Sequence, residues 1–379
     1  MARTTAIILA ALWAAGAAHG APVLERAASA YPMHYSSVDA RIGGRVAEDH
    51  TWISLDNPYI HRLVYQWPGT YFEAAFKGPQ IYFQLDDSLN ILDVLVDGKP
   101  IGQLNKPGHA QYRVTGLSSG AHLIRVERRS ESMSGTADFE GFALPFKHRR
   151  AAPELPPPPP RSRQVEIIGD SYAAGYGTTS TKHECTPDEI HDTTDTQQAF
   201  GPLLAKHYDA DYQINAVSGI GMVRNYDGSA GPVIPDIYPF TLFDKSVPYN
   251  DVSWQPRIVV IALGDNDFAT PVKPGEKWVD FAALRADFIA TYETFVKGIR
   301  AHNPNATFIL MDYGEPELIP DLQTITADLT AAGDTRILTF SPGTNFEQTG
   351  CDWHLSLNDH KRIASGLEAF IDSHPTIWQ

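Results

Sequence analysis

The stretch that decides the fold is VEIIGDSYAAGYG, residues 165–177. Its first four residues, 165–168, predict a short buried strand. Gly169, Asp170 and Ser171 follow at once, and small residues come after them. A serine placed directly after a strand on a Gly-Asp turn is compatible with a nucleophile, a phosphate-binding loop or an ordinary helix cap.

The rest of the chain from residue 164 to residue 379 continues this strand-then-helix pattern. Strands are expected at 165–168, 211–217, 257–263, 306–312 and 335–340, and helices near 196–208, 278–302, 319–332 and 358–373. Such alternation over about two hundred residues predicts a doubly wound parallel sheet. Ligands of these sheets lie beyond the carboxyl ends of the strands, so the residues that follow each strand are the first candidates for a site.

The preceding part of the chain, residues 37–150, has a different pattern. Residues 80–87, QIYFQLDD, alternate with period two, and Asp97-Gly98 between apolar runs is a strong signal for a two-residue hairpin. Short strands without a long amphipathic helix predict a β-sandwich or jelly roll. Residues 151–163, AAPELPPPPPRSR, predict a stiff polyproline spacer between two domains.

The N-terminus predicts export. Residues 1–20 combine a basic Arg3 with a short apolar run and small residues before Ala21, which is typical of a cleaved signal peptide. We therefore expect a secreted or periplasmic protein with no membrane span. The formal charge of −15 argues against binding to nucleic acid or to anionic membranes. In an exported protein, Cys185 and Cys351 predict a disulfide, and two buried free thiols are the alternative.

Four segments that follow predicted strands carry chemically useful residues. They are Ser171, the glycine-rich segment with Gly219 and Gly221, the segment with Asn266 and Asp267, and His354 ahead of the last helix. Each alone has an ordinary explanation as a helix cap, a loop, a turn former or a surface histidine. Their arrival in this order at one edge of one sheet is much more specific.

Together these residues have the composition of a serine esterase site. A serine hydroxyl needs a general base within hydrogen-bond reach, and the pKa of His354 should lie near neutrality. The oxyanion formed by attack on an ester needs donors already aimed at it. The Ser171 amide, the Gly219 amide and the Asn266 side chain supply such donors, and a glycine lets the backbone approach closely.

Other sites are disfavoured by spacing. The stretch GDSYAAGYG fits neither a dinucleotide fingerprint nor a P-loop, and it is not the G-x-S-x-G elbow. The segment HECTPDEIHD matches no standard zinc spacing, and a polar loop is the better interpretation of its metal-ligating residues, His183, Glu184, Asp188 and His191. No metal or other cofactor is expected.

The order Ser171, Gly219, Asn266 and His354 resembles that of the SGNH (GDSL-like) hydrolases. With a β-sandwich, a proline-rich joint and the stretches SGIGMVRNY, LGDNDF and GCDWH, nearly the whole mature chain resembles the family 2 carbohydrate esterases. The resemblance implies a jelly roll followed by a flavodoxin-like three-layer α/β/α domain. It also implies Ser171 as nucleophile, His354 as base, and an oxyanion hole made by Ser171, Gly219 and Asn266.

The sequence departs from the SGNH pattern where the third catalytic residue is expected. Cys351 stands three residues before His354, where an aspartate is usual. Either Asp352 orients the His354 ring, or a backbone carbonyl does so and the enzyme works with a dyad. A Cys185–Cys351 bond would pin the His354 loop.

The resemblance implies removal of acetyl groups from plant polysaccharides such as xylan and glucomannan. Trp353 and Phe268 are candidate sugar platforms, because sugar rings stack on aromatic faces. An esterase or lipase with a non-sugar substrate is one alternative, and a polysaccharide-binding protein with vestigial catalysis is another. We expect a monomer.

Overall fold

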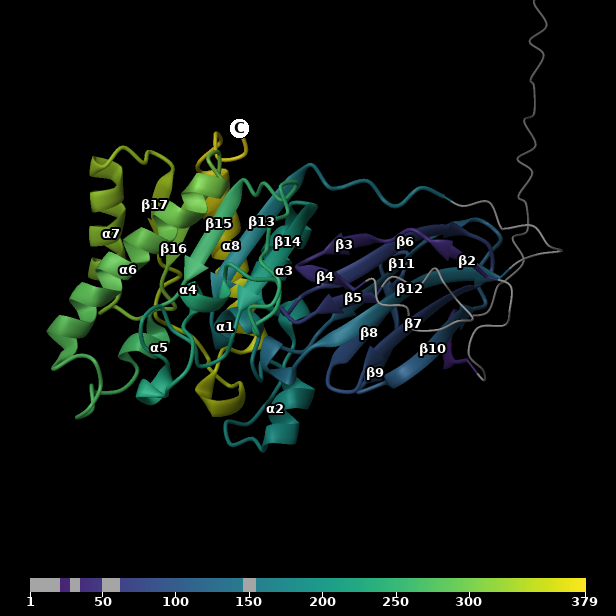
Figure 1. The fold of residues 1–379 in the computed structure, drawn as a ribbon, viewed down its shortest axis with the longest axis horizontal. Helices are drawn as coiled ribbons and strands as arrows, with labels where there is room; N and C mark the ends of the chain where they lie inside the picture. Colours follow the sequence, from purple (N-terminus) through teal and green to yellow (C-terminus); the bar gives the residue numbers. More distant parts are fainter. Residues whose placement is uncertain (1–20, 28–34, 50–61, 146–154) are drawn as a thin grey trace, which may run out of the picture.

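The computed structural model describes residues 21–27, 35–49, 62–145 and 155–379. The expected signal peptide and the first residues of the expected linker, 151–154, lie outside this part of the chain. Figure 1 shows a β-rich N-terminal domain beside an α/β domain that contains the C-terminus.

The N-terminal domain is an antiparallel β-sandwich. One sheet holds, in spatial order, β1 (Val23–Arg26), β10 (Gly108–Thr115), β7 (Ile81–Asp87), β12 (Ala137–Pro145), β5 (Arg62–Tyr65) and β4 (Val46–Asp49), and β2 (Tyr35–Val38) also pairs with β12. The other holds β3 (Arg41–Gly43), β6 (Tyr71–Lys77), β11 (Ala121–Arg128), β8 (Ile91–Val96) and β9 (Lys99–Asn105). The sandwich thus includes strands that precede the expected start at residue 37. The expected hairpin is present, with positive φ at both Asp97 and Gly98.

The C-terminal domain contains all five expected strands in one parallel sheet. The strands are β13 (Arg163–Gly169), β14 (Ala210–Ala216), β15 (Ile258–Ala262), β16 (Thr307–Met311) and β17 (Ile337–Phe340). Their spatial order is β14-β13-β15-β16-β17, the flavodoxin-like order. Alternate residues of β13 face opposite layers, because Ile167 packs with one buried cluster and Ile168 with the other.

Helices cover both faces of this sheet, as the alternation predicts. On the Ile167 side lie α3 (Phe200–His207) and α8 (Leu357–Asp372), and on the Ile168 side lie α6 (Phe281–His302) and α7 (Ile319–Ala331). The expected helix at 196–208 begins instead as a 3₁₀ turn over 196–198. The last helix, α8, begins after Ser356, whose side chain forms a capping box with Asp359.

The sandwich packs against the β14 edge of the parallel sheet (Figure 1). Several contacts between the two domains are buried and polar. Arg45 of the sandwich pairs with Glu166 of β13, and their side chains are only 1% and 0% exposed. Tyr71 donates to Asp211 at 2.7 Å, and Arg161 of the proline-rich segment reaches the same carboxylate at 3.1 Å. Buried charges are costly to leave unpaired, so these contacts hold the two domains in one arrangement.

Candidate functional site

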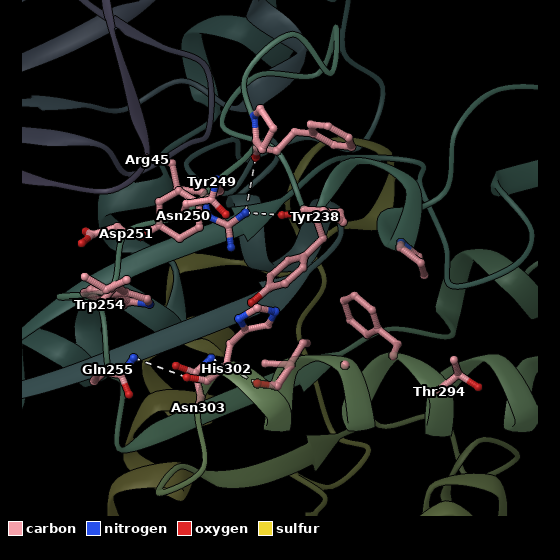
Figure 2. A pocket seen from close by; sticks show the side chains of 18 of the residues that line it. Arg45, Tyr238, Tyr249, Asn250, Asp251, Trp254, Gln255, Thr294, His302 and Asn303 are labelled. Carbon is pink, nitrogen blue, oxygen red and sulfur yellow. Dashed lines mark hydrogen bonds between the residues drawn. The ribbon is translucent and has the colours of Figure 1, made fainter.

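One candidate site is a groove of about 890 Å³ between the 235–255 segment and α6 (Figure 2). It is lined by Gln255, just before β15, and by Asn303, just before β16, so it lies at the amino ends of the strands. Its buried Arg45 already donates to Glu166 and to backbone carbonyls of the groove wall. Nothing in these contacts points to a ligand, and the carboxyl ends of the strands are the better candidate.

Ser171 lies at that carboxyl edge, directly after β13. It opens a short helix, α1 (Ser171–Ala174), whose N-cap is Asp170, and the Asp170 carboxylate accepts from the Tyr172 N–H at 3.1 Å. The helix ends at Gly175 in the left-handed conformation that glycine favours. Ser171 is only 6% exposed.

His354 completes a hydrogen-bonded pair with Ser171. Its Nε2 lies 2.8 Å from Ser171 Oγ, and its Nδ1 lies 2.9 Å from the backbone carbonyl of Cys351. A carbonyl oxygen can only accept, so Nδ1 must carry the proton and Nε2 is free to accept the serine proton. This is the tautomer that a general base for Ser171 requires.

Asp352 does not orient the His354 ring. Asp352 and Trp353 both have positive φ, 50° and 57°, and this turn directs the Asp352 carboxylate to the Tyr176 hydroxyl at 2.8 Å. Of the two arrangements expected for the third member, the backbone carbonyl is the one that the geometry matches. The assignment of Asp352 as the orienting acid is therefore corrected, because the extended segment on which it depended is a left-handed turn.

The environment of His354 favours the neutral imidazole. Burial lowers its pKa below the ordinary 6.5, while the Cys351 carbonyl and the Asp352 charge raise it by smaller amounts. The rings of Tyr172 and Tyr176 pack on the imidazole with centroids 5.1 and 4.3 Å away. His354 therefore remains uncharged and ready to accept a proton at neutral pH.

The Asn266 side chain links the two segments that carry the other expected oxyanion donors, because it contacts Asp170, next to Ser171, and Ile220, next to Gly219. In the described part of the chain, neither the Ser171 N–H nor the Gly219 N–H has an acceptor, and Gly219 has φ of 76°. Asn266 is 5% exposed, and its Nδ2 lies 3.3 Å from both the Asp170 carboxylate and the Ile220 carbonyl. These contacts are at the long end of the hydrogen-bond range, so the Asn266 amide is held loosely by neighbours on both sides.

Asp267 is a structural anchor that sequence reasoning treated only as a turn former. Its buried carboxylate accepts from the N–H groups of Met222, Val223 and Arg224 at 2.8–2.9 Å. Burial raises the pKa of this carboxyl to about 6, against the opposing effect of the amides. Asp267 thereby ties the segment after Gly219 to the segment of Asn266.

The two candidate platforms differ in exposure. Trp353 is 57% exposed next to the base, and the His183 ring lies 4.9 Å from it. Phe268 instead packs against Phe288 at 5.2 Å, with the Arg285 guanidinium 5.0 Å over its ring. Residues of α6 thus cover part of the Phe268 ring, and Trp353 is the better candidate for a sugar platform.

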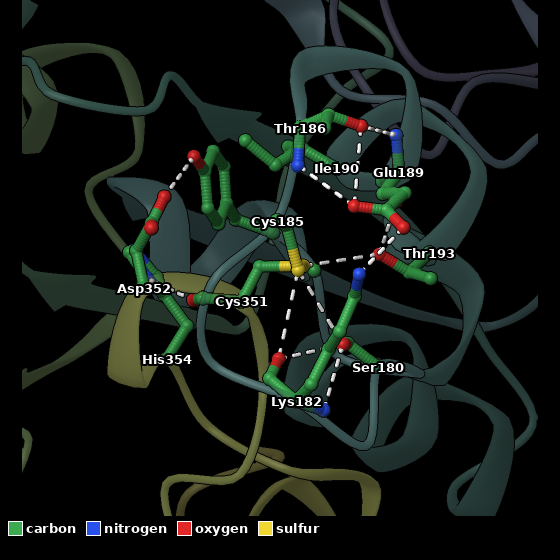
Figure 3. Close-up of a disulfide and its surroundings, with 12 residues drawn as sticks. Ser180, Lys182, Cys185, Thr186, Glu189, Ile190, Thr193, Cys351, Asp352 and His354 are labelled. Atoms are coloured by element: carbon green, nitrogen blue, oxygen red, sulfur yellow. Dashed lines mark hydrogen bonds and ion pairs between the residues drawn. A yellow bond between two sulfur atoms is a disulfide. The ribbon is translucent and has the colours of Figure 1, made fainter.

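The expected disulfide joins Cys185 to Cys351 and lies near His354 (Figure 3). Cys351 also packs against Gly177, where an added Cβ would lie 2.4 Å from the Cys351 Cβ. The Cys351 N–H donates to the Gly177 carbonyl at 3.3 Å. The loop after Ser171, which includes Gly177 and Cys185, and the loop that carries His354 are thus held together at Cys351. The carbonyl of Cys351 is the group that orients His354.

Within the described ranges, no group of three or more His, Cys, Asp or Glu side chains is arranged to hold a metal ion. Over the same residues, no helix combines the length and the apolar character needed to cross a membrane.

Family models match both domains. The model described as carbohydrate esterase 2 N-terminal matches residues 57–156, and that of the GDSL-like lipase/acylhydrolase family matches residues 167–355. Among proteins of known function, the acetylxylan esterase / glucomannan deacetylase of Cellvibrio japonicus is 40% identical, over 89% of this chain and 91% of its own. The cellulase/esterase CelE of Acetivibrio thermocellus is 29% identical, over 80% of this chain but only 37% of its own length.

Solved structures of carbohydrate esterases also resemble this chain over most of its length. A carbohydrate esterase whose active site displays divergent catalytic and non-catalytic binding functions superposes with a TM-score of 0.81 at 36% identity, covering 91% of this chain and all of that one. A family two carbohydrate esterase from Clostridium thermocellum, in complex with cellohexaose, superposes with a TM-score of 0.74 at 26% identity, covering 90% of this chain and 100% of that chain. With family models on both domains and 40% identity over most of both chains, this chain belongs to the family 2 carbohydrate esterases and is a carboxylic ester hydrolase.

Proposed function

We propose that the enzyme removes O-acetyl groups from plant-type polysaccharides, acetylated xylan or glucomannan, by a serine acyl-enzyme mechanism. The observation that carries the proposal is the relay from Ser171 Oγ through His354 to the Cys351 carbonyl. It occurs in a chain that is 40% identical to an acetylxylan esterase / glucomannan deacetylase.

In the proposed acylation step, Ser171 Oγ attacks the acetyl carbonyl and its proton passes to His354 Nε2. The Cys351 carbonyl then accepts from the imidazolium at Nδ1, which stabilises the charge that develops there. The oxyanion is bound by the N–H groups of Ser171 and Gly219 and by the Asn266 amide. His354 returns the proton to the departing sugar oxygen, and a water molecule hydrolyses the acetyl-enzyme by the same route.

Trp353 is the proposed sugar platform. It is exposed, it adjoins His354, and the neighbouring His183 ring lies close to it. A sugar ring stacked on the indole would present its acetylated hydroxyl toward Ser171, since aromatic faces bind the C–H surface of sugars.

The direct test is an acetylated-glycan panel followed by NMR. The proposal expects loss of O-acetyl signals from xylan or glucomannan, and faster hydrolysis of nitrophenyl acetate than of nitrophenyl butyrate. A preference for butyrate or longer chains with no glycan activity would instead support an esterase with a non-sugar substrate. Glycan binding without hydrolysis of any acetyl ester would support the vestigial binding protein.

The pH dependence follows from the environment of His354. The neutral imidazole is the active base, and burial lowers its pKa below 6.5. We therefore expect kcat/KM for nitrophenyl acetate to rise with pH through a midpoint below 6.5 and to be level at pH 7. A midpoint well above 6.5 would contradict this.

Asp352→Asn should change turnover little. Loss of the orienting carboxylate of a serine triad costs about 10⁴ in kcat, whereas here the Cys351 carbonyl holds Nδ1. We expect kcat to fall by less than ~10-fold, a small share of that triad cost. The acid midpoint should move lower, because the Asp352 charge raises the pKa of His354. A triad-sized loss of kcat at unchanged KM would show that Asp352 is the orienting acid after all.

Export is also proposed. The Cys185–Cys351 disulfide supports it, since disulfides persist in oxidising compartments. N-terminal sequencing of the protein recovered from the culture medium or the periplasm should begin at Ala21, the residue after the expected cleavage point.

A further inference from the structure

A glutamate of the sandwich contacts the segment of the catalytic domain that carries Gly219 (residues 218–224, the oxyanion segment). Glu131 follows β11, is 8% exposed, and accepts a hydrogen bond from the Ser218 hydroxyl. Ser218 is itself 8% exposed and directly precedes Gly219. A side chain of one domain thus contacts the residue beside an oxyanion donor of the other.

The turn that carries Glu131 is held firmly within the sandwich. Arg128, whose exposure is 1%, donates through its guanidinium to the backbone carbonyls of Glu131, Ser130 and Gln66. The Ser130 hydroxyl in turn accepts from the Ile91 N–H of β8. Glu131 is therefore presented to Ser218 from a rigid support rather than from a free loop.

The oxyanion segment has anchors on two sides. On its far side, Asp267 of the catalytic domain binds the N–H groups of 222–224. On its near side, Ser218 binds Glu131. Gly219 lies between the anchors at a positive φ of 76°. Glycine adopts this conformation readily, but it has no side chain whose contacts could hold the backbone there.

We propose that Glu131 is a positioning residue for catalysis, which sets the direction of the Gly219 N–H through its hydrogen bond to Ser218. The sandwich then contributes to the transition state without touching the substrate. The inference rests on the proposed serine mechanism and adds to it a residue from the other domain.

The contact depends on an acceptor and not on a charge. Burial raises the pKa of Glu131 to about 7, and the Ser218 hydroxyl and Arg128 oppose that rise. A glutamine at this position keeps a carbonyl oxygen that can accept from Ser218, whereas an alanine does not. Glu131→Gln therefore tests whether the charge matters, whereas Glu131→Ala removes the acceptor together with the volume of the side chain.

The expected kinetics follow from what an oxyanion donor does. A single donor is worth about 10²–10³ in kcat, and a misdirected donor retains part of that value. We expect Glu131→Ala to lower kcat for nitrophenyl acetate by about 10–100-fold, as a fraction of that donor's worth, with little change in KM. Glu131→Gln should recover most of the lost kcat.

Ser218→Ala closes a double-mutant cycle. If Glu131 acts through Ser218, then Ser218→Ala should lower kcat to a similar degree, and the double variant should be no worse than either single one. Ser218→Ala removes one oxygen, so it gives this measurement even if Glu131→Ala fails to fold. Additive losses in kcat, or losses of melting temperature with unchanged kcat, would overturn the proposal.

Glu127→Gln is the matched control. Glu127 is another buried glutamate of the sandwich at the domain interface, where it pairs with Arg125 and approaches Lys206, with no described contact to Ser218. We expect it to lower the melting temperature and leave kcat unchanged. Failure of the serine mechanism would appear separately, as activity that survives Ser171→Ala.

Discussion

Ser171→Ala is expected to lower kcat for acetyl release by about 10⁴–10⁶. Without the hydroxyl, no acyl-enzyme forms, and only the oxyanion donors and substrate binding remain to assist direct attack by water. The change removes one oxygen whose hydrogen-bond partner is the His354 Nε2 at 2.8 Å, so the fold should persist. Acetate release from acetylated glycan and from nitrophenyl acetate measures the loss, and the melting temperature serves as the check on folding.

His354→Ala should cost nearly as much, and the double variant should be no worse than either single one. Residues that act as one unit give non-additive losses of this kind. A Ser171→Ala enzyme whose kcat falls by less than ~10², far short of a serine hydrolase's loss, would show that another group is the nucleophile.

Periodicity and turn chemistry were enough to predict the catalytic sheet. The apolar runs around Ile167 and Val260 are buried on both faces, as parallel strands are, and the helices between them follow from the alternation. The strand order then brings Ser171, Asn266 and His354 to one edge, because the carboxyl ends of parallel strands meet there.

The partner of His354 Nδ1 was harder to predict, because it depends on backbone conformation. An extended segment would place Asp352 and His354 on one face. Asp352 and Trp353 instead take positive φ, which non-glycine residues rarely do, and the carboxylate turns to Tyr176. An aspartate is only a weak signal for such a turn, and the atom that orients the ring belongs to the backbone of Cys351.

Two packing contacts between distant segments were also not predictable from the sequence. Phe268 follows the Asn266 segment as a platform would, yet Arg285 and Phe288 of α6 cover its ring. Glu131 lies in another domain from Ser218, and no local pattern joins them. Both outcomes depend on how separate elements pack, which periodicity does not specify.

Loss of the Cys185–Cys351 disulfide should reduce both stability and turnover. The bond spans 166 residues, and in the chain-entropy model a loop of that length contributes about 5 kcal/mol to the free energy of unfolding. Cys351 also supplies the carbonyl that orients His354 at 2.9 Å. A misplacement of about 1 Å can cost ~10² in rate, so we expect the double variant Cys185→Ser/Cys351→Ser to lose ~10–100-fold in kcat and to melt at a lower temperature.

A control variant distinguishes orientation of the base from general loosening of this region. Glu189→Gln weakens the exposed Lys182–Glu189 pair and the cap of α2 (Pro187–Thr193), close to the disulfide, and leaves both sulfurs in place. It should leave kcat unchanged. Reductant applied to the wild-type enzyme should reproduce the kcat of the double serine variant, because both release the Cys351 carbonyl from the same constraint. If the serine variant melts earlier but keeps full kcat well below its melting temperature, the disulfide stabilises the fold without positioning the base, and Gly177 packed against Cys351 is then sufficient to hold the histidine loop.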